Sequence, residues 1–457
     1  MAHQKISDLP NSWIVTKLPD AIDLILGQSP ASSDCNSDGH GLPFFQGKTE
    51  FGKVYPKVRK YCTAPKKLAE KNDVLLSVRA PVGPTNLATE KCAIGRGLAA
   101  LRTNSDIDFK YLLFYMRHIE PWLSEQGTGS TFKAVSGVFL KELDFFVSPL
   151  PEQKRIVEKL DSLLAQVDTI QQRLNNLPDI IKRFRQSVLA AAVSGKLTEQ
   201  WRGENGQTLK KQESALIKFR DKALTELPST WSWRRFDEVA SIKSNLVDPL
   251  LSPDDVHIAP NHIQANEGKL LEFATVSKDG VKSNKHRFYP GQILYSKIRP
   301  YLCKVVIVDF EGVCSADMYP VETEMETKFM FNWMLSFQFT EWASNGDSRT
   351  VLPKINQKQL SEIPTPVPPA AEQTEIVRLV EQYFALADTL EKNLANAKQR
   401  VDNLTQSILA KAFRGELVPQ DPNDEPADKL LARIKAARLE AEKLEKAAKK
   451  AAKASKK

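Results

Sequence analysis

The chain has 457 residues, of which 42% are hydrophobic and 26% charged, so length predicts about three globular units rather than one. Its five cysteines include no CxxC pair, which argues against a zinc ribbon or a disulfide scaffold and indicates a reducing cytoplasm. Neither the first ten residues nor any later run approaches the ~18 apolar residues of a membrane span, so we expect no secretion signal and no membrane contact.

The net charge of +8 is unevenly distributed. Residues 429–457 contain 11 lysines and arginines and three acidic residues, whereas the rest of the chain has 53 residues of each sign. The body is therefore neutral, and a nucleic-acid interface has to be sought in local clusters of charge.

An internal repeat organises the chain. The sequence LPNSW at 9–13 returns 218 residues later as LPSTW at 227–231, and from about residue 131 an offset of 220 holds for some 65 residues. The pair Glu152-Gln153, for example, returns as Glu372-Gln373. An almost gapless match of this length indicates a duplication, in which a globular unit and a helical unit occur twice.

The globular units are expected at 1–150 and 225–368, with a linker or helix at 206–224 between the two halves. They contain short β-like runs bounded by turn residues, such as 74–78, 293–296 and 305–308. Outside the flanking matches their sequences have diverged, whereas the helical units have stayed alike. This contrast predicts a fixed frame that presents two different recognition surfaces.

Helical spacers are expected at 151–205 and 369–420, followed by a basic helix or tail at 421–457. Their apolar residues recur at alternating intervals of four and three, which predicts a coiled coil. An alternative is that each helix packs only on its own globular unit, as in a helix bundle. Because a short link cannot return the chain, we expect the two helices to be antiparallel. The helix-pairing residues are Ile156, Leu160, Leu163, Val167, Ile170 and Leu174 in the first spacer, and Ile376, Val380, Tyr383, Ala387, Leu390 and Leu394 in the second.

The sequence contains no complete copy of the catalytic and nucleotide-binding motifs considered. Gly47-Lys48-Thr49 lacks the first glycine of a P-loop, and the glycines at 127 and 129 lack the third glycine of a dinucleotide fingerprint. There is no HExxH and no Asn-Pro-Pro-aromatic tetrapeptide, and His257 and His262 are expected to be solvated. We therefore predict that the chain is not an enzyme.

Local basic clusters are the positive signal. Eight lysines and arginines lie between residues 48 and 71, interleaved with aromatic residues. Their side chains could contact successive phosphates of a nucleic-acid backbone. Arginines near strand ends could contact guanine or phosphate, and Arg79 is expected in the place that matches Lys297 and Arg299. A solvated surface is the alternative. The DNA-binding candidates are Lys48, Arg79, Arg96, Lys133, Lys297, Arg299, Arg349 and Lys354.

The segment PLPEQKRIV at 149–157, its copy at 369–377, and the helix ends at 194–198 and 414–418 resemble the conserved regions of the specificity subunit of type I restriction–modification enzymes. The motifs GRGL at 95–98 and YSKIRP at 295–300 look like its target recognition domains. The resemblance implies an α+β fold in which two globular target recognition domains are joined by two long antiparallel coiled-coil helices, with an internal pseudo-twofold repeat.

The same resemblance implies a function and partners. Each recognition domain would read one half of a bipartite asymmetric site in double-stranded DNA, and the helices would bind two methyltransferase subunits and restriction subunits in the cytoplasm. The resemblance places S-adenosylmethionine, ATP and magnesium in the partner subunits, and no cofactor in this chain. The remaining alternatives are a coiled-coil assembly protein and a stand-alone DNA enzyme with an unrecognised site.

The duplication predicts that half of the chain can replace its other half. A fragment ending near residue 222 should dimerise through its single heptad helix, because a second copy supplies the missing partner helix. A symmetric dimer would face a palindromic site whose halves are about 34 Å apart. Sedimentation, followed by mapping of methylated sites with the methyltransferase added, tests this. A monomeric fragment that supports methylation would contradict it.

Overall fold

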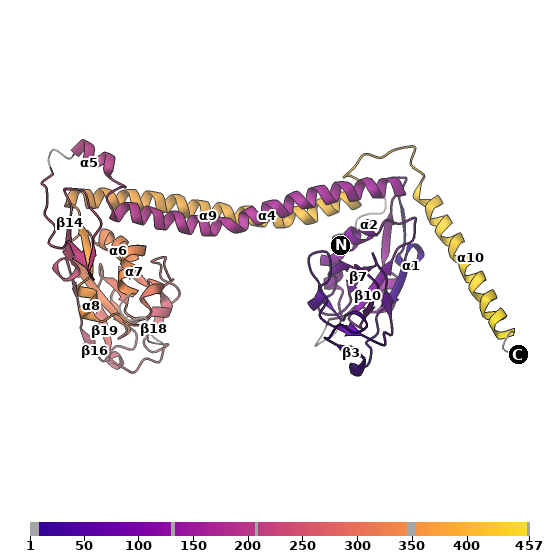
Figure 1. Cartoon of the computed structure of the whole chain (residues 1–457), viewed down its shortest axis with the longest axis horizontal. Helices are drawn as coiled ribbons and strands as arrows, with labels where there is room; N and C mark the ends of the chain where they lie inside the picture. Colours follow the sequence, from indigo (N-terminus) through magenta and orange to yellow (C-terminus); the bar gives the residue numbers. More distant parts are fainter. Residues whose placement is uncertain (1–8, 129–132, 206–208, 345–352, 455–457) are drawn as a thin grey trace. The chain divides into compact units, whose positions relative to one another are not determined.

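The computed structural model describes residues 9–128, 133–205, 209–344 and 353–454. The chain divides into two compact units, one formed by residues 1–173 and 397–457 and the other by residues 174–396. Two 44-residue helices, α4 (Leu150–Val193) and α9 (Ala370–Phe413), each contribute to both units (Figure 1). At ~1.5 Å per residue, each helix is about 66 Å long.

The first globular domain contains an antiparallel four-stranded sheet and a mixed five-stranded sheet beside a two-stranded ribbon. The ribbon pairs β1 (Ile14–Lys17) with β11 (Asp144–Val147). The four-stranded sheet has the order β2 (Asp23–Leu26), β10 (Leu98–Arg102), β7 (Val74–Ser77) and β8 (Thr85–Leu87). The five-stranded sheet has the order β3 (Cys35–Asn36), β5 (Tyr61–Cys62), β4 (Leu42–Phe45), β9 (Cys92–Ile94) and β6 (Leu68–Ala69). Helices α1 (Leu18–Ala21), α2 (Phe109–Glu125) and α3 (Gly137–Lys141) complete it.

The second globular domain repeats this plan. Its ribbon pairs β14 (Ser232–Arg235) with β24 (Pro364–Val367). The four-stranded order is β15 (Ala240–Ile242), β23 (Met318–Thr323), β20 (Ile293–Ser296) and β21 (Val305–Ile307). The five-stranded order is β16 (Leu246–Val247), β19 (Lys285–Phe288), β22 (Gly312–Cys314), β17 (Val256–Ile258) and β18 (Ala274–Thr275). Its helices are α6 (Thr327–Leu335), α7 (Phe337–Ser344) and α8 (Gln357–Ser361).

The shared topology extends the duplication into the parts whose sequences have diverged. In each five-stranded sheet a parallel pair occupies the centre, β4 with β9 and β17 with β22. In each four-stranded sheet a hairpin pairs with the strand that precedes the main helix of the domain. The hairpin β7–β8 pairs with β10, which precedes α2, and the hairpin β20–β21 pairs with β23, which precedes α6. The two domains therefore place their loops on equivalent frameworks.

Short elements lie between the two halves of the chain, and a longer helix follows the second half. Helix α5 (Glu199–Asn205) follows α4. Within 206–224, where the sequence predicted a linker or helix, the described residues form a small hairpin of β12 (Lys218–Phe219) and β13 (Lys222–Ala223). Helix α10 (Ala427–Ala454) lies in the C-terminal segment.

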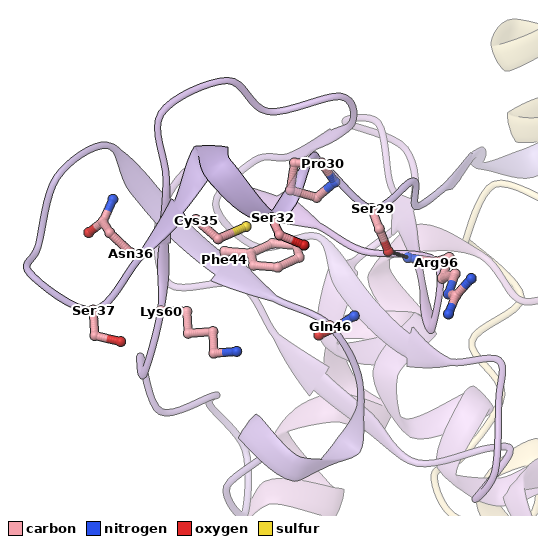
Figure 2. A pocket seen from close by; sticks show the side chains of 10 residues that line it. All are labelled: Ser29, Pro30, Ser32, Cys35, Asn36, Ser37, Phe44, Gln46, Lys60 and Arg96. Carbon is pink, nitrogen blue, oxygen red and sulfur yellow. Dashed lines mark hydrogen bonds between the residues drawn. The ribbon is translucent and has the colours of Figure 1, made fainter.

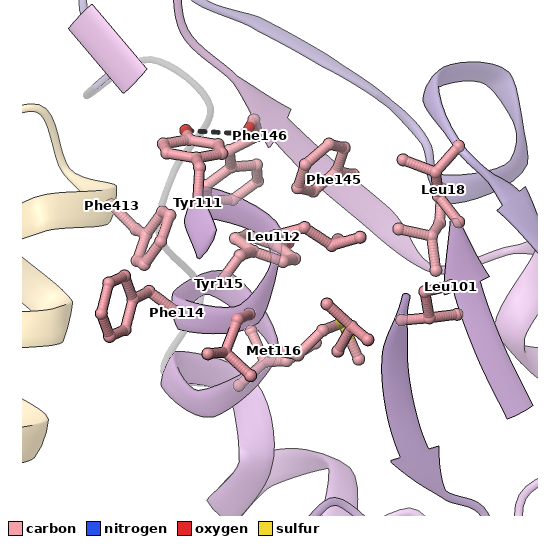
Figure 3. Packing of buried hydrophobic residues seen from close by; sticks show 14 of the residues in the cluster. Leu18, Leu101, Tyr111, Leu112, Phe114, Tyr115, Met116, Phe145, Phe146 and Phe413 are labelled. Carbon is pink, nitrogen blue, oxygen red and sulfur yellow. Dashed lines mark hydrogen bonds between the residues drawn. The ribbon is translucent and has the colours of Figure 1, made fainter. Parts of the chain in front are cut away.

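Each domain packs on the beginning of one long helix and the end of the other. In the first unit, Phe413 at the end of α9 lies against Tyr111 and Tyr115 of α2, with ring centroids 5.3 and 5.2 Å apart (Figure 3). Ile156 and Leu160 from the beginning of α4 join the same core. The second core unites Leu189, Ala192 and Val193 from the end of α4 with Ile376 and Val380 from the beginning of α9. Both alternatives for the helices therefore hold in part, since their ends pack on domains and their middle parts on each other.

Within each unit the long helices run antiparallel. In the second unit Ile181 packs with Ala387 and Leu394, and Arg185 bonds to Asp388 at 2.7 Å. In the first unit Gln171 bonds to Asp402 at 3.2 Å. Helix α4 continues through Pro178, which lies inside it.

Nine of the twelve helix-pairing candidates are buried or half-buried, and three are exposed. Two of the nine are half-buried, Leu163 and Leu174. Seven are buried: Ile156, Leu160, Val167, Ile376, Val380, Ala387 and Leu394. Tyr383 is partly exposed but meets Phe184 of α4 with ring centroids 6.2 Å apart. Ile170 and Leu390, by contrast, are 41% and 46% exposed and lie outside the buried clusters.

A buried glutamate fixes each domain to the helices. Glu152 accepts hydrogen bonds from Nε1 of Trp13 at 3.0 Å and from Nε2 of Gln420 at 2.7 Å. Burial raises the pKa of Glu152. In the repeat, Glu372 accepts from Nε1 of Trp231 at 2.8 Å and from Oγ1 of Thr198 at 2.6 Å, and also pairs with Arg202. The repeated tryptophans and glutamates noticed in the sequence are therefore bonded to each other.

The helix ends that follow these contacts also repeat. Gly195 and Gly415 have positive φ angles of 77° and 74°, as expected for the left-handed residue after a helix. A Cβ on either glycine would come within 2.5 Å of Cγ of Pro228 or 2.3 Å of Cγ of Pro10, respectively. The prolines belong to the repeated LPxxW motif, which explains why that motif and the glycines occur together.

We predict that the two glutamates differ in how much stability they provide. Glu372→Ala leaves the guanidinium of Arg202 in a buried site without its charge partner and should cost about 3–5 kcal/mol. Glu152→Ala leaves only neutral donors and should cost about 1–3 kcal/mol. Hydrogen exchange of the segments around Trp231 and Trp13 measures each loss separately. The double variant Glu372→Ala with Arg202→Leu is the control and should recover part of the loss; equal losses in the two single variants would contradict the argument.

Candidate nucleic-acid interface

Three predicted basic residues of the first domain converge on one hollow. Lys48 follows β4, Arg79 follows β7 and Arg96 follows β9, and all three side chains are exposed. They line a hollow of about 430 Å³ together with Gln46, Gly47, Thr49, Ala80, Pro81 and Gly97. Because β4 and β9 are parallel, their carboxyl ends meet at one edge of the sheet, which places Lys48 and Arg96 together.

A second hollow of about 530 Å³ adjoins the first and shares Gln46 and Arg96 with it. Figure 2 shows Lys60 and Arg96 on opposite sides of Phe44 and Gln46. Four side chains with hydroxyl or amide groups also line this hollow: Ser29, Ser32, Asn36 and Ser37. Positive groups at both edges and polar groups between them suit a polyanion that hydrogen-bonds along its length.

Glycine is required where the two loops meet. A Cβ on Gly97 would lie 2.2 Å from the carbonyl oxygen of Gln46, closer than atoms can approach. Gly97 also accepts a hydrogen bond from the amide of Val78 at 2.9 Å, which ties the hairpin that carries Arg79 to the same place. The motif around Arg96 therefore serves to bring three loops into contact.

Lys133 lies beside this cluster. Arg79 pairs through its backbone with Ala134, the neighbour of Lys133, and Lys133 is exposed. Within the described parts of the chain, Lys48, Arg79, Arg96 and Lys133 form no ion pair, so their charges are available to a ligand. Lys53 from the same basic stretch differs, because it pairs with Asp168 of α4.

The second domain gathers its basic residues in the corresponding hairpin. Lys297 and Arg299 follow β20, and Lys354 lies opposite Ile298 in a backbone bridge. The ammonium groups of Lys297 and Lys354 lie 3.8 and 3.2 Å from Oδ1 of Asp317, which partly neutralises both. Arg349 lies outside the described residues.

Arg299 is the exposed arginine of this hairpin, and sequence reasoning missed its neighbour Lys304. Burial and the positive charge of Arg299 lower the pKa of Lys304, whose Nζ donates to the carbonyl of Pro260 at 2.5 Å. Lys304 directly precedes β21, so the strand pattern at 305–308 was the signal that could have located it in the same hairpin.

The expected match between Arg79 and the pair Lys297 and Arg299 is wrong by one position. Oγ of Ser77 donates to the carbonyl of Arg79 at 3.1 Å, and Oγ of Ser296 makes the same bond to Ile298. Arg79 therefore corresponds to Ile298. The two arginines share a hairpin but not a position, since Arg299 is the residue after the equivalent of Arg79.

The described residues contain no group of three or more side chains that could hold a metal ion. Burial raises the pKa of Cys92 and Cys314 to about 12, so neither thiol is an activated nucleophile. His257 and His262, expected in solvent, are instead buried beside Asp279, with Nδ1 of His257 2.7 Å from its carboxylate. None of the helices in the described parts is long and apolar enough to cross a membrane.

Two stretches, residues 10–179 and 228–398, match the model of the type I restriction modification DNA specificity domain. The chain belongs to this family. It is 44% identical over 440 residues to the type I restriction enzyme EcoDI specificity subunit of Escherichia coli, covering 94% of this chain and 96% of the relative. It is also 35% identical over 341 residues to the EcoKI specificity subunit of Escherichia coli strain K12, covering 69% and 68%.

Solved structures share the fold. The HsdS subunit from Thermoanaerobacter tengcongensis superposes with a TM-score of 0.57 at 17% identity, covering 89% of this chain and 98% of that one. A chain of a type I R-M system reaches a TM-score of 0.64 at 17% identity, covering 89% and 99%. The resemblance to specificity subunits noted in the sequence is confirmed, as is the fold class that it implied.

The hollow around Gly97 gives a prediction with a matched control. Gly97→Ala should separate the loops of Lys48 and Arg96 and weaken binding to any DNA duplex about tenfold at low salt, the scale of losing one or two phosphate contacts. Gly203→Ala in α5 is the control, since a Cβ there meets nothing within 4 Å and Gly203 does not line either hollow. Filter binding with random duplexes measures both, with thermal unfolding to establish that each variant is folded. Wild-type affinity in folded Gly97→Ala would contradict a DNA-binding role for the hollow.

Proposed function

We propose that this chain is the DNA sequence-specificity subunit of a type I restriction–modification complex. Residues 1–150 and 225–368 act as target recognition domains, each of which binds one half of a bipartite asymmetric site. The central spacer at 151–205 and the distal spacer at 369–420 hold the domains, with the linker at 206–224 and the tail at 421–457. The observation that carries the proposal is that one framework, present twice, exposes a different basic cluster at the same hairpin of each copy.

In this proposal the basic residues divide into two roles. Arg79, Arg96 and Arg299 are the candidates for base contact, because a guanidinium can donate two parallel hydrogen bonds to guanine in the major groove. Lysines act as point charges and suit phosphates. This role falls to Lys48, Lys133, Lys297 and Lys354, and Arg349 remains a candidate for phosphate contact.

The partners are two methyltransferase subunits and restriction subunits. The helices offer apolar side chains that this chain does not cover: Leu177, Ile180, Tyr383, Leu386 and Leu390 in the second unit, and Ile170 and Leu404 in the first. Exposed apolar residues along a helix suit packing against helices of another protein. S-adenosylmethionine, ATP and magnesium act in those subunits, and the complex works in the cytoplasm.

A coiled-coil assembly protein that never contacts DNA is the second candidate. It would explain the helices and their exposed apolar residues. It gives no reason for the arginines and lysines at one hairpin and sheet edge of the first domain that form no ion pair with any described residue.

Exchange of one recognition domain tests the proposal. Replacing residues 225–368 by the recognition domain of another specificity subunit should change one half of the methylated site and leave the other half intact. The reason is that each domain binds its own half-site independently of the other domain. The incoming domain has to carry the tryptophan of the LPxxW motif, since Glu372 stays behind on α9. Sequencing of methylated genomic DNA reads both half-sites at once. A change in both halves, or no methylation by a folded and assembled complex, would overturn the modular assignment.

A further inference from the structure

The turn between β20 and β21 of the second domain has an unusual backbone. Arg299 has φ and ψ angles of 48° and 60°, and Cys303 has angles of 42° and 59°. Both residues are left-handed although neither is glycine or asparagine, the residues that adopt this conformation at least cost. Such strain persists only where the surroundings impose it, and it is concentrated at ligand-binding segments.

Hydrogen bonds on every side hold the turn in place. The amide of Arg299 donates to the carbonyl of Pro353 at 2.8 Å, and the amide of Leu302 donates back to the carbonyl of Arg299 at 2.9 Å. The amide of Asn266 donates to the carbonyl of Leu302 at 3.1 Å. The backbone of the turn is therefore fixed by two other loops.

The inner side of the turn is packed. Pro300 and Cys303 are buried, and Sγ of Cys303 donates to the carbonyl of Met334 at 3.3 Å. Helix α7 packs against the short helical turn at 300–302. A rigid base of this kind positions its exposed side chains without further ordering on binding.

The outer side of the turn presents Arg299 and Tyr301. Arg299 is exposed and Tyr301 is 51% exposed. The lysines that flank the turn already have partners, since Lys297 donates to the carbonyl of Ala316 at 2.6 Å and Lys304 to that of Pro260. Among the residues that the structure describes, the guanidinium of Arg299 is thus the positive group of the turn that has no ion-pair partner.

The corresponding turn of the first domain, residues 78–84, contains no left-handed arginine. In the corresponding hairpin, the left-handed residue is Gly83, with φ of 109°, and Arg79 does not have a positive φ. A glycine at 299 would satisfy the backbone of the second domain at less cost. The presence of arginine there points to a requirement for its side chain.

We propose that the turn 298–303 is the base-reading element of the second recognition domain, in which Arg299 donates to the O6 and N7 acceptors of a guanine and Tyr301 packs beside it in the major groove. The inference rests on the proposed function, in which Arg299 is one candidate for base contact, and adds the fixed backbone of the turn and Tyr301 as parts of one reading element. The fixed backbone gives the guanidinium one orientation, which is what discrimination between bases requires.

The test uses the full chain assembled with its methyltransferase subunits, and duplexes that carry its mapped site or a single base-pair change. Arg299→Gly should unfold at the same or a higher temperature, because it relieves backbone strain. It should bind the mapped site about 5- to 150-fold more weakly, which corresponds to about 1–3 kcal/mol for one base contact. Discrimination should disappear at one G·C pair of the second half-site, and Tyr301→Ala should weaken binding to the mapped site.

Two further variants separate the side chain from its charge and its backbone. Arg299→Lys keeps the charge and should keep the salt dependence while losing discrimination at the same base pair. Arg220→Gly is the matched control, because Arg220 is also left-handed, with φ of 48°, but lies in the β12–β13 hairpin. It should leave binding to all duplexes unchanged.

The outcomes separate failure of the inference from failure of the proposed function. Equal weakening of Arg299→Gly on all duplexes, with a salt slope reduced by about one, would mean a phosphate contact and would overturn base reading. Unchanged discrimination in Arg299→Gly would also overturn it. If the wild-type complex prefers no duplex over random DNA, the proposed function itself fails.

Discussion

The hydrogen bond between a domain's tryptophan and a glutamate at the start of a long helix is the constraint on which the rest depends. A buried carboxylate is tolerated only where donors surround it. Glu152 and Glu372 each meet this demand with one donor from the domain and others from the segment after the opposite helix. Each carboxylate therefore joins three parts of its unit, and any shift of the domain on the helices would break a bond in an apolar setting.

Because this attachment holds each domain on the long helices, the exposed loops of the two domains can differ in sequence while the sheets and helices keep their arrangement within each unit. The four-stranded sheets of the two domains share their strand order, the five-stranded sheets share four strands in the same order, and the same serine-to-carbonyl bond closes the hairpin in both domains. On that hairpin, Arg79 lies in one domain and Arg299 in the other, and Gly97 of one domain corresponds in hydrogen bonding to Asp317 of the other. Substitutions at the exposed hairpin positions of Arg79 and Arg299 change the charge and shape of the surface and cost the core little, whereas a side chain at Gly97 would collide with the backbone of Gln46.

The sequence was sufficient for the repeat, the long helices and their glycine caps, because those signals are local or periodic. It was insufficient for the pairing of the sheets, since strands of two to six residues with diverged sequences are paired by long-range contacts. The heptad pattern was also too simple, since Ile170 and Leu390 are exposed although their neighbours in the pattern, such as Val167 and Leu394, are buried. His257 and His262 were misjudged because Asp279, which lies between them in space, is distant in sequence.

Net charge was the least informative signal about the candidate site, and the structure gives the reason. The basic C-terminal segment begins as a structural element, since Ala427, Leu430, Leu431 and Ile434 of α10 belong to the core of the first unit. Arg433 and Arg438 pair with Asp106 and Asp23 of the first domain. Charges that are satisfied within the fold contribute little to a ligand site. Lys48, Arg79 and Arg96 differ, because three strand ends bring like charges together and no carboxylate is among the described residues that line their hollow. Such an arrangement is unfavourable for the isolated chain and would be relieved by a bound polyanion.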